Sequence, residues 1–276
     1  MSVAALSIVV VTFNAREDVL ACLDSVHANP PDRPWQLVVV DNQSADGTPE
    51  AIAERWPDVQ LLRLPENIGF AAANNIGIRE THGDLILLLN SDTLVEAGQL
   101  EGLCRALESE PSAAVAGPQL VDGTGQQELS FGVMISPLGE TRQKLRGRLL
   151  TDGPALARQR IAAAMTRRHF VDWVSGACLL VRRGPAEQVG LLDERYFMYC
   201  EDVDFCAAVR AAGHRILYAP EVRVTHLRGR SRATAPTLTN RRYRDSQVAF
   251  YRKHHPKWAR LLRWYLAARD ITGRHS

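Results

Sequence analysis

Two polar segments in this sequence follow apolar runs, and both have the chemistry to bind a charged ligand. The first is Asn90-Ser91-Asp92, which comes directly after the apolar run Leu85–Leu89. A carboxylate at the end of a strand can hold a hard divalent cation, and Mg²⁺ completes its shell with phosphate oxygens and water. Such a cation would neutralise a departing diphosphate. The alternative is a polar turn in which Asp92 caps the segment that follows it.

The second segment begins at Asp41, which ends the apolar run of QLVVVD and precedes the turn sequence NQSADGT. A carboxylate only accepts hydrogen bonds. It would suit the N3–H of a pyrimidine base, and uracil and thymine both carry that proton. Asp41 therefore does not distinguish the two bases. The alternative is an Asx-turn or a helix cap, because this sequence has turn chemistry in any case.

A third acidic group, Glu201-Asp202 with Asp204, stands at the start of a predicted helix. The helix dipole stabilises carboxylates there, which is a structural reason for their presence. The same position keeps a carboxylate ionised and directed outward, as a general base requires. Glu201 and Asp202 are adjacent and point in different directions, so one of them is expected to be structural.

His226 follows the alternating run EVRVT and would suit a metal that needs a second protein ligand. A lone histidine is more often structural. The segment ENIGFAAANNIGI combines small residues, which allow close approach to a ligand, with asparagines that could bind hydroxyls or phosphates. It contains neither a P-loop nor a G-x-G-x-x-G motif. The alternative is a helix start that packs on a sheet.

The elements that must position these residues alternate between strands and helices. Buried strands are predicted in LSIVVVTFN, QLVVVD and DLILLLNSD, with a shorter one in VQLLRL, and helices over residues 15–27 and 48–56. This alternation indicates a parallel sheet with right-handed crossovers. Ligands of such sheets bind beyond the carboxyl ends of the strands, which is where the polar segments fall.

The pattern changes after Gly117. GPQLVDGTGQQELSFG predicts turns and short strands, and residues 140–168 are Arg-rich and partly helical, with breaks at Gly147 and at Gly153-Pro154. VDWVSGACLLVRR predicts a strand. The segment from 193 to 220 predicts a loop, a helix that ends at Gly213, and a strand.

Composition and charge narrow the class of protein. The 276 residues are 46% hydrophobic, enough for a full core. Five cysteines without a C-x-x-C pair predict a reducing, cytosolic location. The N-terminus has no basic leader, so no signal peptide is expected, and no apolar run approaches the roughly 20 residues that span a bilayer. Residues 228–276 hold 13 Lys/Arg and two acids, a charge of +11, whereas residues 1–227 carry −9.

The motifs occur together in a fixed order: SIVVVTFN, VVVDNQSADGT, ENIGFAAANN, LLLNSDT, WVSGACLLVRR, FMYCEDVDFCAAVRAAGHRI and VTHLRGRS. This set resembles the family 2 inverting glycosyltransferases of the GT-A fold, and within them the bacterial rhamnosyltransferase-type members. The resemblance covers roughly residues 5–232.

The resemblance implies an α/β, GT-A type fold that binds a nucleotide-diphospho-sugar, with a mainly parallel central sheet flanked by helices. The charge pattern adds a basic helical C-terminal tail to this fold. It implies a divalent cation, Mg²⁺ or Mn²⁺, and single-displacement transfer with inversion. Asp202 would be the catalytic base, and Asp92 and His226 the metal ligands. Asn90 stands where the family has the first acid of its D-x-D motif, which leaves Asp92 as the metal carboxylate of this motif. The remaining residues implied are Thr12, Phe13, Asn14, Asp41, Asn67, Gly69, Asn74, Asn90 and Ser91 for the donor, and Trp173 and Glu201 for the acceptor or sugar pocket.

We therefore expect a glycosyltransferase domain over residues 1–227, with a nucleotide-binding half at 1–117 and an acceptor half at 118–227, and a basic helical extension at 228–276. The best hypothesis is transfer of L-rhamnose from dTDP-L-rhamnose to a saccharide or polyprenyl-diphosphate-linked acceptor in cell-surface polysaccharide synthesis. The alternatives are a UDP-sugar-dependent transferase of the same family and a catalytically idle nucleotide-binding module.

The tail combines positive charge with aromatic residues. From Lys257 on, Trp258, Leu261, Leu262 and Tyr265 are predicted on one helical face, which suits a helix at an anionic membrane surface. The alternative is a C-terminal helix packed on the domain with a solvated basic face. Nucleic acid is not an expected partner, because no recognised module supports it. The hypothesis is a cytoplasmic protein attached peripherally to the cytoplasmic face of the membrane.

Overall fold

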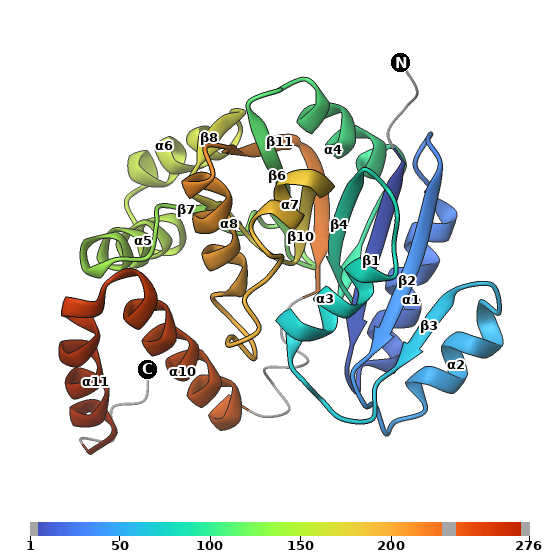
Figure 1. Ribbon diagram of the computed structural model, residues 1–276. Coiled ribbons are helices and arrows are strands. Elements are labelled where there is room, and N and C mark those ends of the chain that lie inside the picture. The colour runs from blue at the N-terminus through green and yellow to red at the C-terminus, as the bar shows by residue number, and fades with distance from the viewer. Residues whose placement is uncertain (1–4, 228–235, 272–276) are drawn as a thin grey trace.

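The computed structural model describes residues 5–227 and 236–271, and its centre is one extended β-sheet (Figure 1). Four strands of the first half lie parallel in the order β3-β2-β1-β4. They are β1 (Leu6–Thr12), β2 (Trp35–Asp41), β3 (Gln60–Arg63) and β4 (Leu85–Asn90). The uninterrupted apolar runs of β1, β2 and β4 fit strands covered on both faces. The predicted strands and their parallel arrangement are thus confirmed.

The sheet continues through the second half of the chain in the order β4-β10-β6-β11-β5. Strand β10 runs antiparallel to both of its neighbours, whereas β6 and β11 are parallel to each other. The strands of this half are β5 (Thr93–Leu94), β6 (Ala113–Val121), β8 (His169–Val171), β10 (Cys178–Arg182) and β11 (Arg215–His226). A small second sheet pairs β7 (Phe131–Gly132) with β9 (Trp173–Val174).

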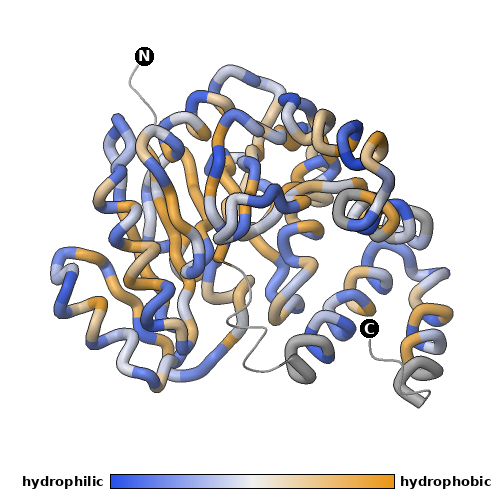
Figure 2. The backbone as a smooth tube through the Cα atoms, turned by 180° about the vertical axis from the view of Figure 1, so that it is seen from behind, coloured by the Kyte–Doolittle hydropathy of each residue, from blue (hydrophilic) through white to orange (hydrophobic). Residues whose placement is uncertain are grey.

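Helices cover the sheet on both faces. On one face α1 (Arg16–Ala28), α2 (Thr48–Arg55) and α4 (Gln99–Glu108) contribute to the larger apolar core. On the other face lie α3 (Phe70–Arg79), α7 (Arg183–Gln188) and α8 (Glu201–Ala211). Figure 2 shows the hydrophobic strands gathered in the middle of the molecule, with hydrophilic segments toward the outside. The architecture is therefore three layers, with the apolar cores between sheet and helices.

Two further helix pairs flank these layers. The first is α5 (Pro137–Thr151) and α6 (Ala155–Met165). The second is α10 (Pro236–His254) and α11 (Pro256–Ile271), which form a hairpin in Figure 1. Phe250, Tyr251 and Ala259 of this hairpin are buried in a cluster with Tyr196, Cys200 and Val203. The described part of the C-terminal tail is thus packed on the segment that leads into α8.

The structure corrects two predictions on the second half. Gly147 does not break the Arg-rich segment, because α5 continues through it to Thr151. A glycine costs a helix interior about 1 kcal/mol relative to alanine, which the rest of a long helix can outweigh. The predicted break at Gly153-Pro154 is confirmed, since α5 ends before it and α6 begins after it. Proline has no N–H for the helix ladder.

The second correction concerns GPQLV, which was predicted as turns and short strands but completes the long strand β6. Gly117 lies where a Cβ would stand 2.6 Å from Val174, so glycine at this position permits a close approach that the sequence pattern does not reveal. The division proposed between residues 117 and 118 falls inside this strand.

Within residues 5–227 and 236–271, no helix combines the length and the apolar character that a bilayer span requires.

Candidate active site

The carboxyl ends of three neighbouring strands bring predicted donor residues together. Strand register places Thr12 of β1 beside Asp41 of β2, and Val11 beside Asn90 of β4. Three buried oxygens here, Thr12 Oγ1, Asp41 Oδ1 and Asn90 Oδ1, have no hydrogen-bond partner among the described residues. Buried polar atoms are normally hydrogen-bonded, so a cluster of unsatisfied acceptors suits a ligand that brings its own donors.

The two carboxylate oxygens of Asp41 have different surroundings. Its Oδ2 accepts a hydrogen bond from the backbone N–H of Ser44 at 3.0 Å, which is the turn contact. Its Oδ1 is left for another donor. The adjacent loop is fixed by Asn14, whose Oδ1 accepts from the Ala45 N–H at 2.8 Å, and Phe13 is 45% exposed beside it. Any contact of Thr12, Phe13 or Asn14 with a nucleotide stays a prediction.

The asparagines of the segment 67–75 form hydrogen bonds within the protein. Asn67 Oδ1 accepts from Asn42 Nδ2 at 3.0 Å and from the Gly69 N–H at 3.1 Å. Buried Asn74 donates to the Phe70 carbonyl at 2.9 Å. These contacts organise the entrance to α3, and any contact of Asn67, Gly69 or Asn74 with a donor stays a prediction.

Gly69 is required by the backbone at this point. It has φ of +91°, which side chains rarely adopt, and a Cβ would lie 2.5 Å from the Phe197 carbonyl oxygen. The neighbouring Phe70 N–H donates to that same oxygen at 2.7 Å. The donor-side helix α3 is therefore joined directly to the loop that precedes α8.

Asp92 and His226, the two predicted metal ligands, are far apart in the sequence and lie close together in the structure. Asp92 follows β4, and His226 is the last residue of β11, which pairs with the short strand β5 next to Asp92. His226 Nε2 lies 3.3 Å from Asp92 Oδ1. Adjacent ligands of an octahedral cation with bonds of about 2.1 Å are about 3 Å apart, so the two atoms fit a shared Mg²⁺ or Mn²⁺.

Two protein ligands are few, and the described residues contain no group of three or more His, Cys, Asp or Glu side chains arranged to hold a metal. This number fits a cation that keeps water and diphosphate oxygens in its shell better than a closed structural site. Ser91 lies in the turn between Asn90 and Asp92, at the same edge of the sheet.

Asp202 lies in the first turn of α8, shortly after two residues with left-handed backbone conformations. Tyr199 and Cys200, directly before the helix, have φ of +71° and +67°. Asp202 Oδ2 accepts from the Gly176 N–H at 2.9 Å, and its Oδ1 accepts from the Val203 N–H at 2.8 Å. These two bonds hold the carboxylate in one orientation. Burial raises the pKa of Asp202, and the two backbone N–H groups oppose that shift. A raised pKa makes a carboxylate a stronger proton acceptor.

Glu201 is more deeply buried than Asp202, and its Oε2 has no partner among the described residues. Burial raises the pKa of Glu201 well above its ordinary value, and the nearby negative charge of Asp202 adds to the shift. The folded protein therefore binds a proton at Glu201 more tightly than the unfolded chain does. This effect stabilises the fold at low pH, and the stabilisation is lost as pH rises through the folded-state pKa.

Glu201→Gln is accordingly expected to raise the melting temperature above that of the wild type at pH 8, with a gain that disappears near pH 4. The neutral amide removes the need to ionise a buried group. Thermal denaturation of both proteins across this pH range measures the difference. A gain of equal size at both pH values would show that the buried charge is not its cause.

Trp173 lies on a strand that contacts the helix of Asp202. It lies on β9, immediately before the turn that contains Gly176, and β9 contacts α8. Its Nε1 donates to the Val133 carbonyl at 2.8 Å, and its ring packs partly against two apolar clusters. The ring is half-buried. It is thus fixed in orientation and partly open to solvent, and its place in an acceptor or sugar pocket stays a prediction.

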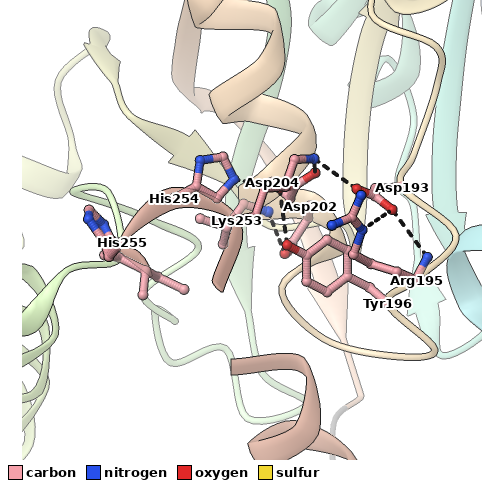
Figure 3. Close-up of polar contacts among 10 residues, drawn as sticks. Asp193, Arg195, Tyr196, Asp202, Asp204, Lys253, His254 and His255 are labelled. Atoms are coloured by element: carbon pink, nitrogen blue, oxygen red, sulfur yellow. Dashed lines mark hydrogen bonds and ion pairs between the residues drawn. The ribbon is translucent and has the colours of Figure 1, made fainter. Parts of the chain in front are cut away.

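Two features near the site were not identified from sequence. Glu128 Oε2 lies 3.3 Å from His226 Nδ1, on the other side of the imidazole from Asp92. Asp204, treated only as one of three helix-start acids, is the centre of a polar network (Figure 3). Nothing in the local sequence marks Glu128, and no local pattern pairs Asp204 with Lys253 or His254, which lie about 50 residues later in the chain.

The Asp204 network joins α8 to α10. Asp204 accepts hydrogen bonds from Tyr196 Oη at 3.1 Å, Lys253 Nζ at 2.7 Å and His254 Nε2 at 2.6 Å. Lys253 also bonds Asp193 at 2.8 Å. Burial alone would lower the pKa of Lys253, but its bonds to the two carboxylates raise the pKa above its ordinary value.

Comparison with known sequences identifies the family. The glycosyl transferase family 2 sequence model matches residues 7–170. The N-acetylglucosaminyl-diphospho-decaprenol L-rhamnosyltransferase of Mycobacterium tuberculosis is 33% identical over 247 residues, which cover 85% of this chain and 80% of the relative. The rhamnosyltransferase WbbL of Escherichia coli is 43% identical over 56 residues, 20% of this chain and 21% of that protein.

Solved structures show the same fold. GalNAc-T7, crystallised with UDP, GalNAc and Mn²⁺, has a TM-score of 0.62 at 16% identity, and the match covers 82% of this chain and 43% of that one. The mannosyltransferase PcManGT from Pyrobaculum calidifontis, in complex with GDP-Man and Mn²⁺, has a TM-score of 0.58 at 18% identity, over 95% of this chain and 70% of the other. The architecture is that of the GT-A glycosyltransferases, and the chain belongs to glycosyl transferase family 2 and is a glycosyltransferase.

Proposed function

We propose that this enzyme transfers L-rhamnose from dTDP-L-rhamnose to a polyprenyl-diphosphate-linked saccharide in cell-surface polysaccharide synthesis, with inversion at the anomeric carbon. The observation that carries the proposal is the meeting of Asp92 and His226 at 3.3 Å, next to the unsatisfied oxygens of Thr12, Asp41 and Asn90. The rhamnosyltransferase of Mycobacterium tuberculosis, similar along 85% of the chain, supports the choice of sugar and of a lipid-linked acceptor.

The donor nucleotide would lie along the ends of β1, β2 and β4. Asp41 Oδ1 is a buried acceptor without a partner among the described residues, and it would accept the N3–H of a thymine or uracil base. Thr12 and the loop of Phe13 and Asn14 would line the nucleotide. Asn67, Gly69 and Asn74 would lie near the ribose, diphosphate or sugar.

Asp92 and His226 would hold the divalent cation, and Asn90 and Ser91 would contact the donor beside it. When bound, the cation neutralises the charge that develops on the leaving diphosphate. GalNAc-T7 and PcManGT, which share the fold, were both solved with Mn²⁺.

Asp202 would act as the base. The acceptor hydroxyl attacks the anomeric carbon from the face opposite the diphosphate, and its proton passes to Asp202 as the new glycosidic bond forms. The backbone N–H groups of Gly176 and Val203 keep the carboxylate in place during this transfer. Trp173 would support the sugar or the acceptor from the adjacent strand, with Glu201 beneath the same pocket.

Thermal shift with dTDP, UDP, GDP and ADP, each with and without Mn²⁺, tests the donor assignment. A ligand that binds only the folded state raises the melting temperature. We expect a Mn²⁺-dependent shift with dTDP that exceeds the shift with UDP. A larger shift with UDP would favour a UDP-sugar, and no shift with any nucleotide would favour an idle module.

The C-terminal hairpin would attach the enzyme to a membrane. Four large apolar side chains of α11 are exposed: Trp258 at 49%, Leu261 at 53%, Trp264 at 72% and Tyr265 at 51%. Leu262, predicted on the same face as Trp258, instead packs toward the domain with Ala259. The packed side of α11 is therefore separate from its exposed side, and the docked helix still presents aromatic residues to solvent.

The occupant proposed for this surface is the anionic face of the cytoplasmic membrane. A basic helix with exposed tryptophan and leucine inserts shallowly at the boundary between lipid headgroups and acyl chains. The linker between α10 and α11 is joined to the start of the Arg-rich α5 region, since His255 Nε2 lies 2.8 Å from the Ile135 carbonyl oxygen. The parts of the tail at residues 228–235 and 272–276 lie outside the described residues.

Wild-type protein is expected to co-sediment with phosphatidylglycerol vesicles at low salt and to stay in the supernatant with phosphatidylcholine vesicles. The combined variant Leu261→Ser, Trp264→Ser should bind anionic vesicles at least about tenfold more weakly, because both side chains contribute buried apolar area at the interface. Equal sedimentation of the variant and the wild type would show that this face does not contact lipid.

A further inference from the structure

His226 lies between two carboxylates from distant parts of the chain. Its Nε2 is 3.3 Å from Asp92 Oδ1, and its Nδ1 is 3.3 Å from Glu128 Oε2. The two ring nitrogens lie on different edges of the imidazole, so the carboxylates approach it from different sides. Asp92 is the most exposed of the three side chains, at 25%, compared with 13% for Glu128 and 8% for His226. A ligand from solvent therefore reaches Asp92 first, on the Nε2 edge of the ring.

Glu128 is held by a short hairpin after β6. Its backbone N–H donates to the Leu120 carbonyl at 2.9 Å. The turn of the hairpin is closed by Asp122, whose Oδ1 accepts from the N–H groups of Thr124 at 2.8 Å and Gln126 at 2.9 Å. These hydrogen bonds fix the backbone at Glu128 and so hold its carboxylate beside His226.

The hydrogen bond between Glu128 and His226 determines which ring nitrogen carries the proton and which can bind a metal. A carboxylate accepts hydrogen bonds, so the contact at Nδ1 requires a proton on Nδ1. In the neutral ring the lone pair then lies on Nε2, the nitrogen that faces Asp92. Outer-shell carboxylates of this kind fix the tautomer and orientation of metal-binding histidines, and losing one costs about 10–100-fold in metal affinity or activity.

We propose that Glu128 is a positioning residue for the cation site, which acts by fixing the tautomer and the orientation of His226 and does not itself bind the metal. The inference rests on the metal site of the proposed function. It adds a third residue to that site, from a segment in which sequence patterns indicated only turns and short strands.

Titration of the protein with Mn²⁺ at saturating dTDP, followed by the electron paramagnetic resonance signal of free Mn²⁺, tests this role without an acceptor or turnover. Glu128→Ala is expected to weaken Mn²⁺ binding about 10–100-fold. Glu128→Gln should weaken it less than about tenfold, because the amide oxygen still accepts the Nδ1 proton. Circular dichroism confirms that each variant is folded.

Two control variants distinguish a failure of the role proposed for Glu128 from a failure of the metal site itself. Glu221→Gln, which changes an exposed acid of the same strand β11, should leave Mn²⁺ affinity unchanged. His226→Ala should weaken binding at least as much as Glu128→Ala. Unchanged affinity in Glu128→Ala, with a loss in His226→Ala, would overturn the inference alone. Equal losses in the Ala and Gln variants would overturn it in favour of direct ligation. No dTDP-dependent Mn²⁺ binding by the wild type would overturn the metal site of the proposed function as well.

Discussion

Asp202→Asn is expected to lower kcat by about 10²–10⁴-fold while dTDP binding stays the same. The amide cannot take the proton of the acceptor hydroxyl, and general-base help contributes that range. The change is nearly isosteric, and the amide oxygen can still accept one of the two backbone hydrogen bonds that the carboxylate accepts from Gly176 and Val203. Transfer from dTDP-L-rhamnose, together with the thermal shift by dTDP and Mn²⁺, measures both quantities.

The matched control is Asp58→Asn, an exposed acid before β3, which should change neither quantity. Wild-type turnover in Asp202→Asn would remove the assignment of the base. A loss of dTDP binding equal to the loss of turnover would instead place Asp202 among the donor contacts. The pH dependence gives a second test. Because burial raises the pKa of Asp202, the acid limb of the kcat/KM profile should lie above the ordinary aspartate pKa of about 3.9.

Asp204→Asn is expected to lower the free energy of unfolding by about 3 kcal/mol. Removing one partner of a buried charged pair costs about 3–5 kcal/mol, and Lys253, one third exposed, places the effect at the lower end. The amide of asparagine would turn a donor toward Lys253 or toward Tyr196 and His254, all of which donate to the carboxylate. Figure 3 shows these groups converging on Asp204 from α10 and from the loop before α8.

Urea denaturation measures this loss, and Asp193→Asn is its matched control. Asp193 bonds the same Lys253 and also Arg195, but it lies at the more exposed rim of the network. Rim ion pairs contribute about 1 kcal/mol or less, so the control should be correspondingly mild. Equal losses in the two variants would show that burial of Asp204 is not what makes the network strong. Because α8 also carries Asp202, we expect Asp204→Asn to lower transfer activity as well.

The C-terminal hairpin contacts the loop that precedes Asp202. Arg242 of α10 stacks over the Phe197 ring at 3.7 Å, and Ser246 Oγ donates to the Met198 carbonyl at 2.7 Å. The loop that contains Phe197 also contacts Gly69 at the entrance to α3. The loop before the proposed base is therefore held between α3 and α10, and the tail packs on the domain, as one of the two alternatives from the sequence had it.

Local pattern in the sequence determined the layered fold and the edge where the site lies. Continuous apolar runs such as Leu85–Leu89, bounded by polar residues, favour strands covered on both faces, and their polar ends mark the carboxyl edge of a parallel sheet. The ordered motifs were enough to indicate family 2, which the comparisons confirmed. The pairing of Asp92 with His226 followed from motif order, and the structure brings the two side chains together.

What the sequence could not supply were contacts between segments whose separation along the chain follows no local rule. Glu128 meets His226 across 98 residues, and Asp204 meets Lys253 across 49. The insertion of β10 antiparallel between β4 and β6 likewise depends on which strand edges are available for pairing in the assembled sheet. Local periodicity reports which face of an element is buried. Which partner covers that face, and which polar groups meet there, was decided by packing in three dimensions.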